Sequence, residues 1–358
     1  MTDGHASAAS TRHIIQTPSA VETLAARPFL NEPDTGIDDA LGQIPTHSLP
    51  NLTEIFGLPD FEWAARRHLD SASYAWYRNA AGGEWSYRNN LEVFGRINMK
   101  PRVLVDITNI KDSLPTTILG YNFSAPFFIS PCAKASYANP NDAEDGLVKG
   151  AAAGDILYII AAAKPKSSQV LFQQLYVTNN LTSTQAVMRR AEKAGYKALI
   201  LTVEAPASGD RQRAHRFGWQ LYKQLQNMTS IPIIPKGITS VEDARMALQA
   251  GAPAIFLSNH GGRQLDTSPS SLEAAIEIYQ QAPEIFNQVE VYADGGVRYA
   301  VGMGRPFMYA NMYGSRGVKQ AIDIMKNEMA LDAANLGVAD LRKINASYMR
   351  WENNGWYS

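Results

Sequence analysis

A histidine, an arginine and an aspartate follow directly after an apolar run in the stretch SNHGGRQLD, residues 258–266. His260 can take up a proton, and Arg263 can bind a carboxylate through two parallel hydrogen bonds. A turn with a purely structural role needs the glycines but has no use for both of these side chains. The apolar residues 254–257, AIFL, have the composition of a short buried strand. The stretch therefore predicts a base and a positive charge at the end of a strand.

Further apolar runs along the chain are also followed by polar residues. They lie at 126–130, 156–161, 170–177, 198–203, 231–236, 254–258 and 289–294, and an eighth is possible at 301–304. Amphipathic stretches typical of helices, such as 184–196, 241–251 and 271–282, separate them. This alternation predicts parallel strands joined by crossover helices, and it fits an α/β fold of the TIM (β/α)8-barrel type better than an open sheet.

The eighth strand is expected to be incomplete. Only Tyr299 and Ala300 separate DGGVR (294–298) from VGMGRP (301–306), whereas a parallel crossover takes about a dozen residues. We therefore expect a gap or a remnant in place of this strand and of the helix before it. Residues 1–50 are rich in small and polar residues and predict a mostly disordered arm, so that residues 51–358 form the barrel domain.

The polar side chains at the carboxyl ends of the predicted strands indicate one shared site, because these ends meet at one mouth of a barrel. They are Gln174, Tyr176, Thr202, Glu204, Lys236, His260, Arg263, Asp294, Arg298 and Arg305, with Arg211 shortly after the fourth strand. Each has a structural explanation when taken alone, but their convergence favours a site. The glycine-rich strand ends suit a phosphate, Lys236 suits a negatively charged cofactor ring, and the arginines suit a carboxylate. With His260 as base, this set points to oxidation next to a carboxylate.

SNHGGRQLD resembles the active-site signature of the FMN-dependent α-hydroxy acid oxidases and dehydrogenases, the family of glycolate oxidase, lactate oxidase and flavin-linked lactate dehydrogenases. The likeness extends from about residue 58 to residue 341 through KPRVLVDI, QLYV, LTVEAP, IPIIPKG, DGGVR and GRPFMYA. It implies FMN as cofactor and the oxidation of a small 2-hydroxy acid to the 2-oxo acid. It also implies a homo-tetramer, since members of the family are often tetrameric.

The resemblance assigns roles to individual residues. His260 would be the base, Arg211 and Arg263 would bind the substrate carboxylate, Tyr176 would hold the hydroxyl, and Glu204 would orient the base. The FMN-binding residues would be Pro131, Cys132, Ala133, Gln174, Thr202, Lys236, Ser258, Asp294, Gly295, Gly296, Val297, Arg298, Gly304 and Arg305.

The chain departs from the family pattern at several places. Trp76 stands where the family has a tyrosine that binds the carboxylate, Ile160 where it has a flavin-contacting serine, and Glu204 where it has an aspartate. The lid loop after Arg211 is also short. A degenerate member that keeps the fold without catalysis is therefore the alternative, and another phosphate-binding barrel is a weaker one. The hydroxy acid and the electron acceptor, oxygen or another, stay open.

Composition narrows the functional class further. The formal net charge of −1 gives no reason to expect a nucleic-acid or anionic-membrane partner. Cys132 is the only cysteine, which favours a reducing compartment, and the chain shows neither a secretory signal nor an apolar stretch long enough to span a bilayer. We expect a cytoplasmic protein. No His, Asp and Glu grouping has metal-ligand spacing, so no metal is expected.

Overall fold

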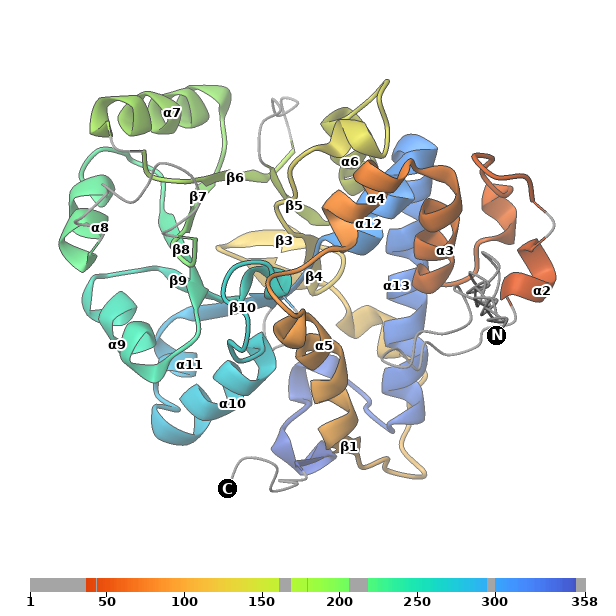
Figure 1. Cartoon of the computed structure of the whole chain (residues 1–358). Coiled ribbons are helices and arrows are strands. Elements are labelled where there is room, and N and C mark those ends of the chain that lie inside the picture. The colour runs from red at the N-terminus through yellow and green to blue at the C-terminus, as the bar shows by residue number, and fades with distance from the viewer. Residues whose placement is uncertain are drawn as a thin grey trace, which may run out of the picture.

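A closed barrel of eight parallel strands forms the centre of the molecule (Figure 1). The computed structural model describes residues 37–42, 44–160, 169–178, 180–205, 218–294 and 300–351. In barrel order the strands are β10 (Glu290–Asp294), β11 (Ala300–Met303), β4 (Phe127–Ile129), β5 (Leu157–Ile160), β6 (Leu171–Leu175), β7 (Ala198–Thr202), β8 (Ile233–Ile238) and β9 (Ala254–Leu257). Every apolar run expected to be a strand is one, and the TIM-type barrel is confirmed.

The strands are apolar throughout because both of their faces are buried. Alternate side chains point into the barrel and out towards the helices. Inside, Phe128 of β4 and Phe256 of β9 meet edge to face with ring centroids 5.5 Å apart, so the interior is a packed core. The whole of β7, ALILT, is buried. The barrel therefore positions side chains at its ends and contains no channel.

The predicted gap at the eighth strand is wrong. β11 pairs in parallel with β10 on one side and with β4 on the other. Ala300 lies opposite Tyr292, so the chain leaving Asp294 has to return by only two residues along the strand, or roughly 7 Å, while it crosses to the next strand. The five intervening residues can extend to more than twice that distance, at about 3.3 Å each. The length rule for crossovers applies to connections that contain a helix, and this short return needs none.

An outer layer of helices covers the barrel. Its members are α6 (Glu144–Gly154), α7 (Leu181–Ala194), α8 (Trp219–Gln226), α9 (Val241–Gln249), α10 (Ser271–Gln281), α11 (Ile285–Gln288), α12 (Arg305–Ala310) and α13 (Gly314–Asn335). In Figure 1, α7 to α11 lie on one side of the barrel, and α6 and α13 lie on the other. A Cβ on Gly150 of α6 would come within 2.4 Å of the Val318 side chain of α13, so this glycine lets the two helices approach closely. No helix among the described residues is long and apolar enough to span a membrane.

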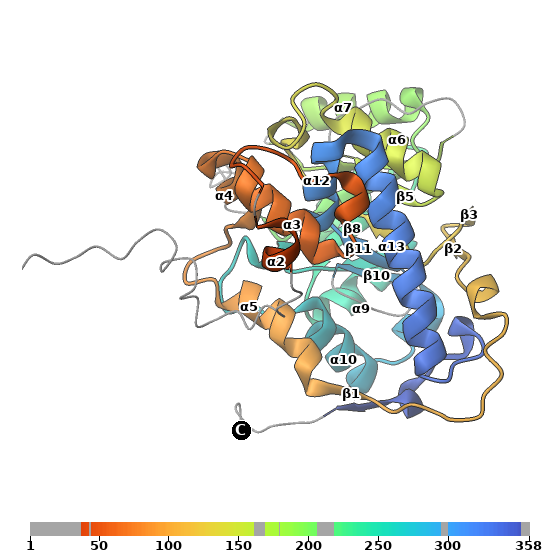
Figure 2. The same ribbon diagram turned by 90° about the vertical axis from the view of Figure 1, so that its right-hand side faces the viewer.

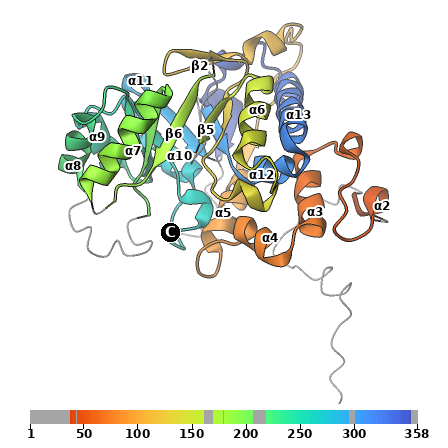
Figure 3. The same ribbon diagram turned by 90° about the horizontal axis from the view of Figure 1, so that it is seen from above.

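Two N-terminal helices, α4 (Ser71–Arg78) and α5 (Trp85–Glu92), lie at the carboxyl ends of the strands, which we call the barrel mouth: the Tyr77 carbonyl of α4 accepts from Arg263, and Gly262 lies against Tyr87 of α5. Before them in the chain, α3 (Leu58–His68) packs against α12 and α13. The hairpin of β2 (Thr116–Ile118) and β3 (Tyr121–Phe123) lies at the opposite end, where the Leu119 amide donates to the Glu290 carboxylate at the start of β10 (Figures 2 and 3). The barrel mouth is thus covered by chain that precedes the barrel.

The segment between residues 58 and 78 is divided into two helices, α3 and α4. The Asp70 side chain accepts hydrogen bonds from the amides of Ala72 and Ser73, so it caps a new helix and ends the previous one. Of the predicted arm, residues 1–36 lie outside the described residues, and α2 (Ile37–Leu41) buries Leu41 in the core. Near the other end of the described chain, β12 (Met349–Trp351) pairs antiparallel with β1 (Ile97–Met99).

Candidate active site

A buried lysine, a buried glutamate and a histidine meet at the barrel mouth. Glu204 follows β7, Lys236 lies on β8, and His260 follows β9. One carboxylate oxygen of Glu204, Oε1, accepts a hydrogen bond from Lys236 Nζ and lies 3.0 Å from His260 Nδ1. The side chains of Lys236 and Glu204 are 5% and 8% exposed, whereas the side chain of His260 is 24% exposed. The three strand ends thus bring together the groups that the sequence predicted.

The mutual attraction of Glu204 and Lys236 favours the ionised form of both side chains. Burial on its own would raise the pKa of the Glu204 carboxyl, but the Lys236 ammonium and the His260 ring outweigh it, so the pKa lies below its usual value. Burial would lower the pKa of Lys236, and the carboxylates of Glu204 and Asp294 raise it instead. Because an ionised carboxylate only accepts hydrogen bonds, His260 Nδ1 carries the proton shared with Glu204. In the neutral ring, Nε2 is then free to accept a proton.

Ser258, at the end of β9, connects the lysine, the histidine and Asp294. Its hydroxyl accepts hydrogen bonds from Lys236 Nζ at 2.7 Å and from the His260 amide at 3.0 Å, and it donates to Asp294 Oδ2 at 2.6 Å. Asp294 Oδ2 is also 3.7 Å from Lys236 Nζ. These contacts link the ends of β8, β9 and β10 in one buried polar network.

The histidine is presented by a left-handed turn. His260, Gly261 and Gly262 have φ values of 59°, 65° and 73°, a conformation that costs little at glycine and more at histidine. A Cβ on Gly262 would lie 2.6 Å from the Tyr87 amide nitrogen of α5, so this position also requires the missing side chain. Asn259 holds the turn, since its side-chain oxygen accepts from the Gly262 amide at 3.1 Å. Both glycines of the sequence stretch therefore have a structural explanation.

Arg263 and Arg305 converge on the carbonyl oxygen of Tyr77, at the end of α4. Arg263 donates to it at 3.1 Å and to the Asn79 carbonyl at 2.8 Å, and Arg305 donates to it at 2.8 Å and to the Gly261 carbonyl at 3.1 Å. Neither guanidinium has a carboxylate partner among the described residues. Burial and the neighbouring Arg305 lower the pKa of Arg263. Two adjacent cations without an anion form a place where a bound anion would be stabilised.

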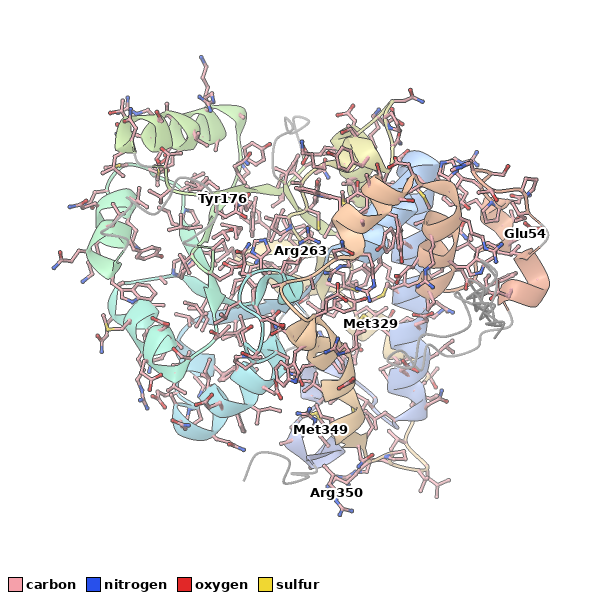
Figure 4. All side chains as sticks on the ribbon, in the orientation of Figure 1. Glu54, Tyr176, Arg263, Met329, Met349 and Arg350 are labelled. Atoms are coloured by element: carbon pink, nitrogen blue, oxygen red, sulfur yellow. The ribbon has the colours of Figure 1, made fainter. Side chains whose placement is uncertain are left out.

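The rim beside these arginines is aromatic. The Trp76 ring centroid is 5.9 Å from the Arg263 guanidinium carbon and 6.0 Å from the Tyr137 ring, which it meets edge to face. Trp76 is 43% exposed. In Figure 4, Tyr176 lies at the end of β6 and Arg263 beside α4. Tyr176 is near enough to Lys236 and Arg263 to contribute to the pKa of both.

The remaining predicted residues that the structure describes also lie at strand ends. Gln174 on β6 donates to the Thr202 hydroxyl on β7 at 2.9 Å. Pro131, Cys132 and Ala133 follow β4, and a Cβ on Gly304 would lie 2.5 Å from the Cys132 sulfur, which brings the ends of β4 and β11 together. Burial raises the pKa of the Cys132 thiol, although Arg305 and Arg263 oppose it. This thiol is therefore not activated as a nucleophile.

Some predicted residues lie outside the described residues, namely Arg211, Gly295, Gly296, Val297 and Arg298. Ile160, which stands where the family has a serine, is fully buried at the end of β5 and belongs to the core around the barrel. Within the described ranges, no group of three or more His, Cys, Asp or Glu side chains is arranged to hold a metal ion.

Two contacts of the site escaped the sequence analysis. Asp266, the last residue of SNHGGRQLD, accepts hydrogen bonds from the amides of Gly83 and Ser86 at 2.8 and 3.0 Å, and so caps α5 from a distant part of the chain. Ser271 of α10 donates to Asp294 Oδ1 at 3.0 Å. The excess of polar residues in the segment was visible in the sequence, but no local pattern indicates partners so far away.

The donors and acceptors at the mouth fit the polar edge of a flavin ring. Lys236 has three N–H groups, and hydrogen bonds to Glu204 and Ser258 use two of them among the described residues, so one is left for a ligand. The buried hydroxyl of Ser130, directly after β4, has no hydrogen-bond partner among the residues that the structure describes. Buried polar atoms are usually paired, so such an orphan suits a ligand with its own donors and acceptors. The fit at a phosphate end rests on Arg305, because the glycine-rich residues 295–298 are not described.

Fold and site together define a class: a closed eight-stranded α/β barrel with a histidine–glutamate pair, two adjacent arginines and a buried lysine at its mouth. The family model of FMN-dependent dehydrogenases matches residues 65–221 and 214–351. The chain therefore belongs to the FMN-dependent dehydrogenase family, the family of the α-hydroxy acid oxidases and dehydrogenases.

Individual relatives support this membership. The chain is 31% identical to glycolate oxidase of Spinacia oleracea, over 84% of this chain and 97% of that protein. It is 30% identical to the L-lactate dehydrogenase (cytochrome) of Saccharomyces cerevisiae over 83% of this chain, but spans only 61% of that protein's length. A solved structure of a mutant flavocytochrome b2 with pyruvate bound has a TM-score of 0.79 and 29% identity, and covers 90% of this chain and 91% of that chain.

Proposed function

We propose that this protein oxidises a 2-hydroxy acid to the corresponding 2-oxo acid with FMN as its cofactor. The observation that carries the proposal is the His260–Glu204 pair, which lies in one mouth with an arginine that has no carboxylate partner among the described residues. A base next to a vacant positive charge suits a substrate with a proton to lose next to a carboxylate.

Binding is the role of the arginines. Arg263 uses one nitrogen, Nη1, for the carbonyls of Tyr77 and Asn79, which fix the guanidinium plane. Its remaining N–H groups suit a carboxylate held by two hydrogen bonds. Arg211 would add a second cation, and Tyr176 would hydrogen-bond the substrate hydroxyl. The aromatic rim at Trp76 favours side chains larger than those of glycolate and lactate, since indole provides a broad apolar surface.

Proton removal is the role of His260. Its Nε2 takes a proton from the substrate while Nδ1–H stays hydrogen-bonded to Glu204, whose carboxylate stabilises the imidazolium. FMN, when bound, would accept the two electrons and the second proton that the substrate loses. Lys236 would hold the ring edge with its free N–H and place a positive charge beside it. Ser130, Gln174, Thr202 and the glycine-rich strand ends would complete the cofactor site.

The visible absorption spectrum of the purified protein tests the proposal, followed by anaerobic addition of single 2-hydroxy acids. We expect a flavin spectrum that is bleached by at least one acid with a bulky side chain. His260→Asn is the matched variant, since it should bind FMN but be bleached far more slowly than wild type. A protein that takes up no added FMN would refute the proposal. A flavin spectrum that no 2-hydroxy acid bleaches would favour the non-catalytic alternative instead.

A further inference from the structure

Ser271 contacts the polar network at the mouth from the helix layer. It is 3% exposed, and its hydroxyl donates to Asp294 Oδ1 at 3.0 Å. The other oxygen of Asp294 accepts from Ser258, which in turn accepts from Lys236. We propose that Ser271 is a positioning residue for the cofactor site, which orients Asp294 and, through Ser258, the ammonium group of Lys236.

The directions of these hydrogen bonds are determined by chemistry. A backbone amide and an ammonium group can only donate, so Ser258 accepts from His260 and Lys236 with both of its lone pairs. Its single O–H must then donate to Asp294. Ser258 has no spare bond with which to adjust, so its orientation depends on where Asp294 Oδ2 lies. The Asp294 carboxylate can rotate about its last side-chain bond, and among the described residues Ser271 is the group that fixes the second oxygen.

The orientation of Asp294 affects a bound ligand through the ammonium group of Lys236. Two of its N–H groups are used by Glu204 and Ser258, so the direction of the third depends on both partners. If Asp294 rotates, Ser258 follows it, and the free N–H of Lys236 turns away from the ring edge. This step rests on the proposed function, since it takes the ligand of Lys236 to be FMN.

A purely structural role for Ser271 in α10 is the alternative. The helix start is already capped by Ser270, whose hydroxyl accepts from the Glu273 amide at 3.2 Å, while Glu273 Oε2 accepts from the Ser270 amide at 2.8 Å. This capping box needs nothing from the neighbouring hydroxyl. The side-chain hydrogen bonds of Ser270 in the described part of the chain go to Glu273 and not to Asp294, so Ser270 offers a matched control one residue away.

The first test compares the variants Ser271→Ala, Ser271→Thr and Ser270→Ala in the FMN-loaded protein. We expect Ser271→Ala to raise the Kd for FMN about five- to tenfold, as for the loss of one hydrogen bond, and to shift the midpoint potential of bound FMN to a more negative value. Ser271→Thr, which keeps the hydroxyl, should restore both. Ser270→Ala should lower Tm and leave Kd and potential unchanged. Equal effects of Ser270→Ala and Ser271→Ala on Kd and potential would overturn the proposal, because both would then act through helix stability.

The second test needs no cofactor. Ser271→Ala should lower the Tm of the FMN-free protein, and that loss should largely disappear when Asp294→Ala is already present, because the alanine offers the Ser271 hydroxyl no partner. Additive losses of Tm would show that Ser271 does not act through Asp294. This cycle keeps its meaning even if the protein takes up no FMN. Failure to take up FMN would refute the proposed function, and the Tm values alone would then decide whether Ser271 positions Asp294.

Discussion

Removal of the charge of Glu204 should destabilise the protein strongly. Glu204→Gln keeps the size of the side chain but leaves the Lys236 ammonium, 5% exposed, with the Ser258 hydroxyl and with Asp294 Oδ2 3.7 Å away. Loss of one partner of a buried ion pair costs about 3–5 kcal/mol. Because Asp294 compensates in part, we expect a loss of about 3 kcal/mol in the free energy of unfolding, the lower end of that range.

The pH dependence of this loss identifies its cause. The pKa of Glu204 is lower in the folded protein than its usual value of 4.5, so the folded state binds the proton only at lower pH than the unfolded chain. Stability from the ionised carboxylate is therefore fully present above pH 4.5 and is lost as the pH falls through the folded-state pKa. The sign for Lys236 is opposite. Its raised pKa contributes stability below pH 10.5, which is lost as the pH rises through the folded-state value.

Urea unfolding followed by tryptophan fluorescence, at neutral pH and again below pH 4.5, measures both quantities. The difference between wild type and Glu204→Gln should shrink in acid, because the wild-type carboxyl then becomes neutral as well. Glu277→Gln is the control, since Glu277 is exposed on α10 and should change stability by no more than about 0.5 kcal/mol. A difference for Glu204→Gln that is as small as that of the control, or that stays constant with pH, would refute the reasoning.

Four further changes test other parts of the site. His260→Asn should slow anaerobic flavin reduction by about 10²–10⁴-fold with little change in FMN affinity, as measured by stopped-flow absorbance. Arg263→Lys should raise KM about tenfold or more, because a lysine cannot bind a carboxylate through a planar pair of N–H groups; an unchanged KM would contradict the carboxylate role. Wild type should prefer bulky 2-hydroxy acids to glycolate, and Trp76→Tyr should shift kcat/KM towards glycolate; equal turnover of both by wild type would contradict the role of the rim. Gly262→Ala should lower the free energy of unfolding by roughly 1–3 kcal/mol in urea melts, because its Cβ would meet the Tyr87 amide.

The strands could be predicted because their cause is local. A strand buried on both faces must be apolar along its length, so runs such as 198–203 mark β7 (Ala198–Thr202) closely. The helices of the outer layer follow from their own apolar period in the same way. Closure of the barrel is different, because it depends on the register between strands. The pairing of Ala300 with Tyr292 makes a short connection sufficient, and register cannot be read from the length of a connection.

The candidate site likewise contains residues that could be predicted from local sequence and contacts that could not. Glu204, Lys236 and His260 each follow or end a strand, and the geometry of a barrel alone brings such residues together. The contacts of Asp266 with Gly83 and Ser86 join segments far apart in the chain, and their hydrogen bonds involve backbone amides that every residue has. A single sequence contains no signal for such contacts, because any residue type at 83 or 86 other than proline provides the same donor.

Asp294, the last residue of β10, is held by groups that precede the short connection to β11. Ser258 on β9 and Ser271 on α10 each hold one carboxylate oxygen of Asp294. Ser258 also holds the amide of His260, so the base and the buried lysine are fixed by elements that precede the connection.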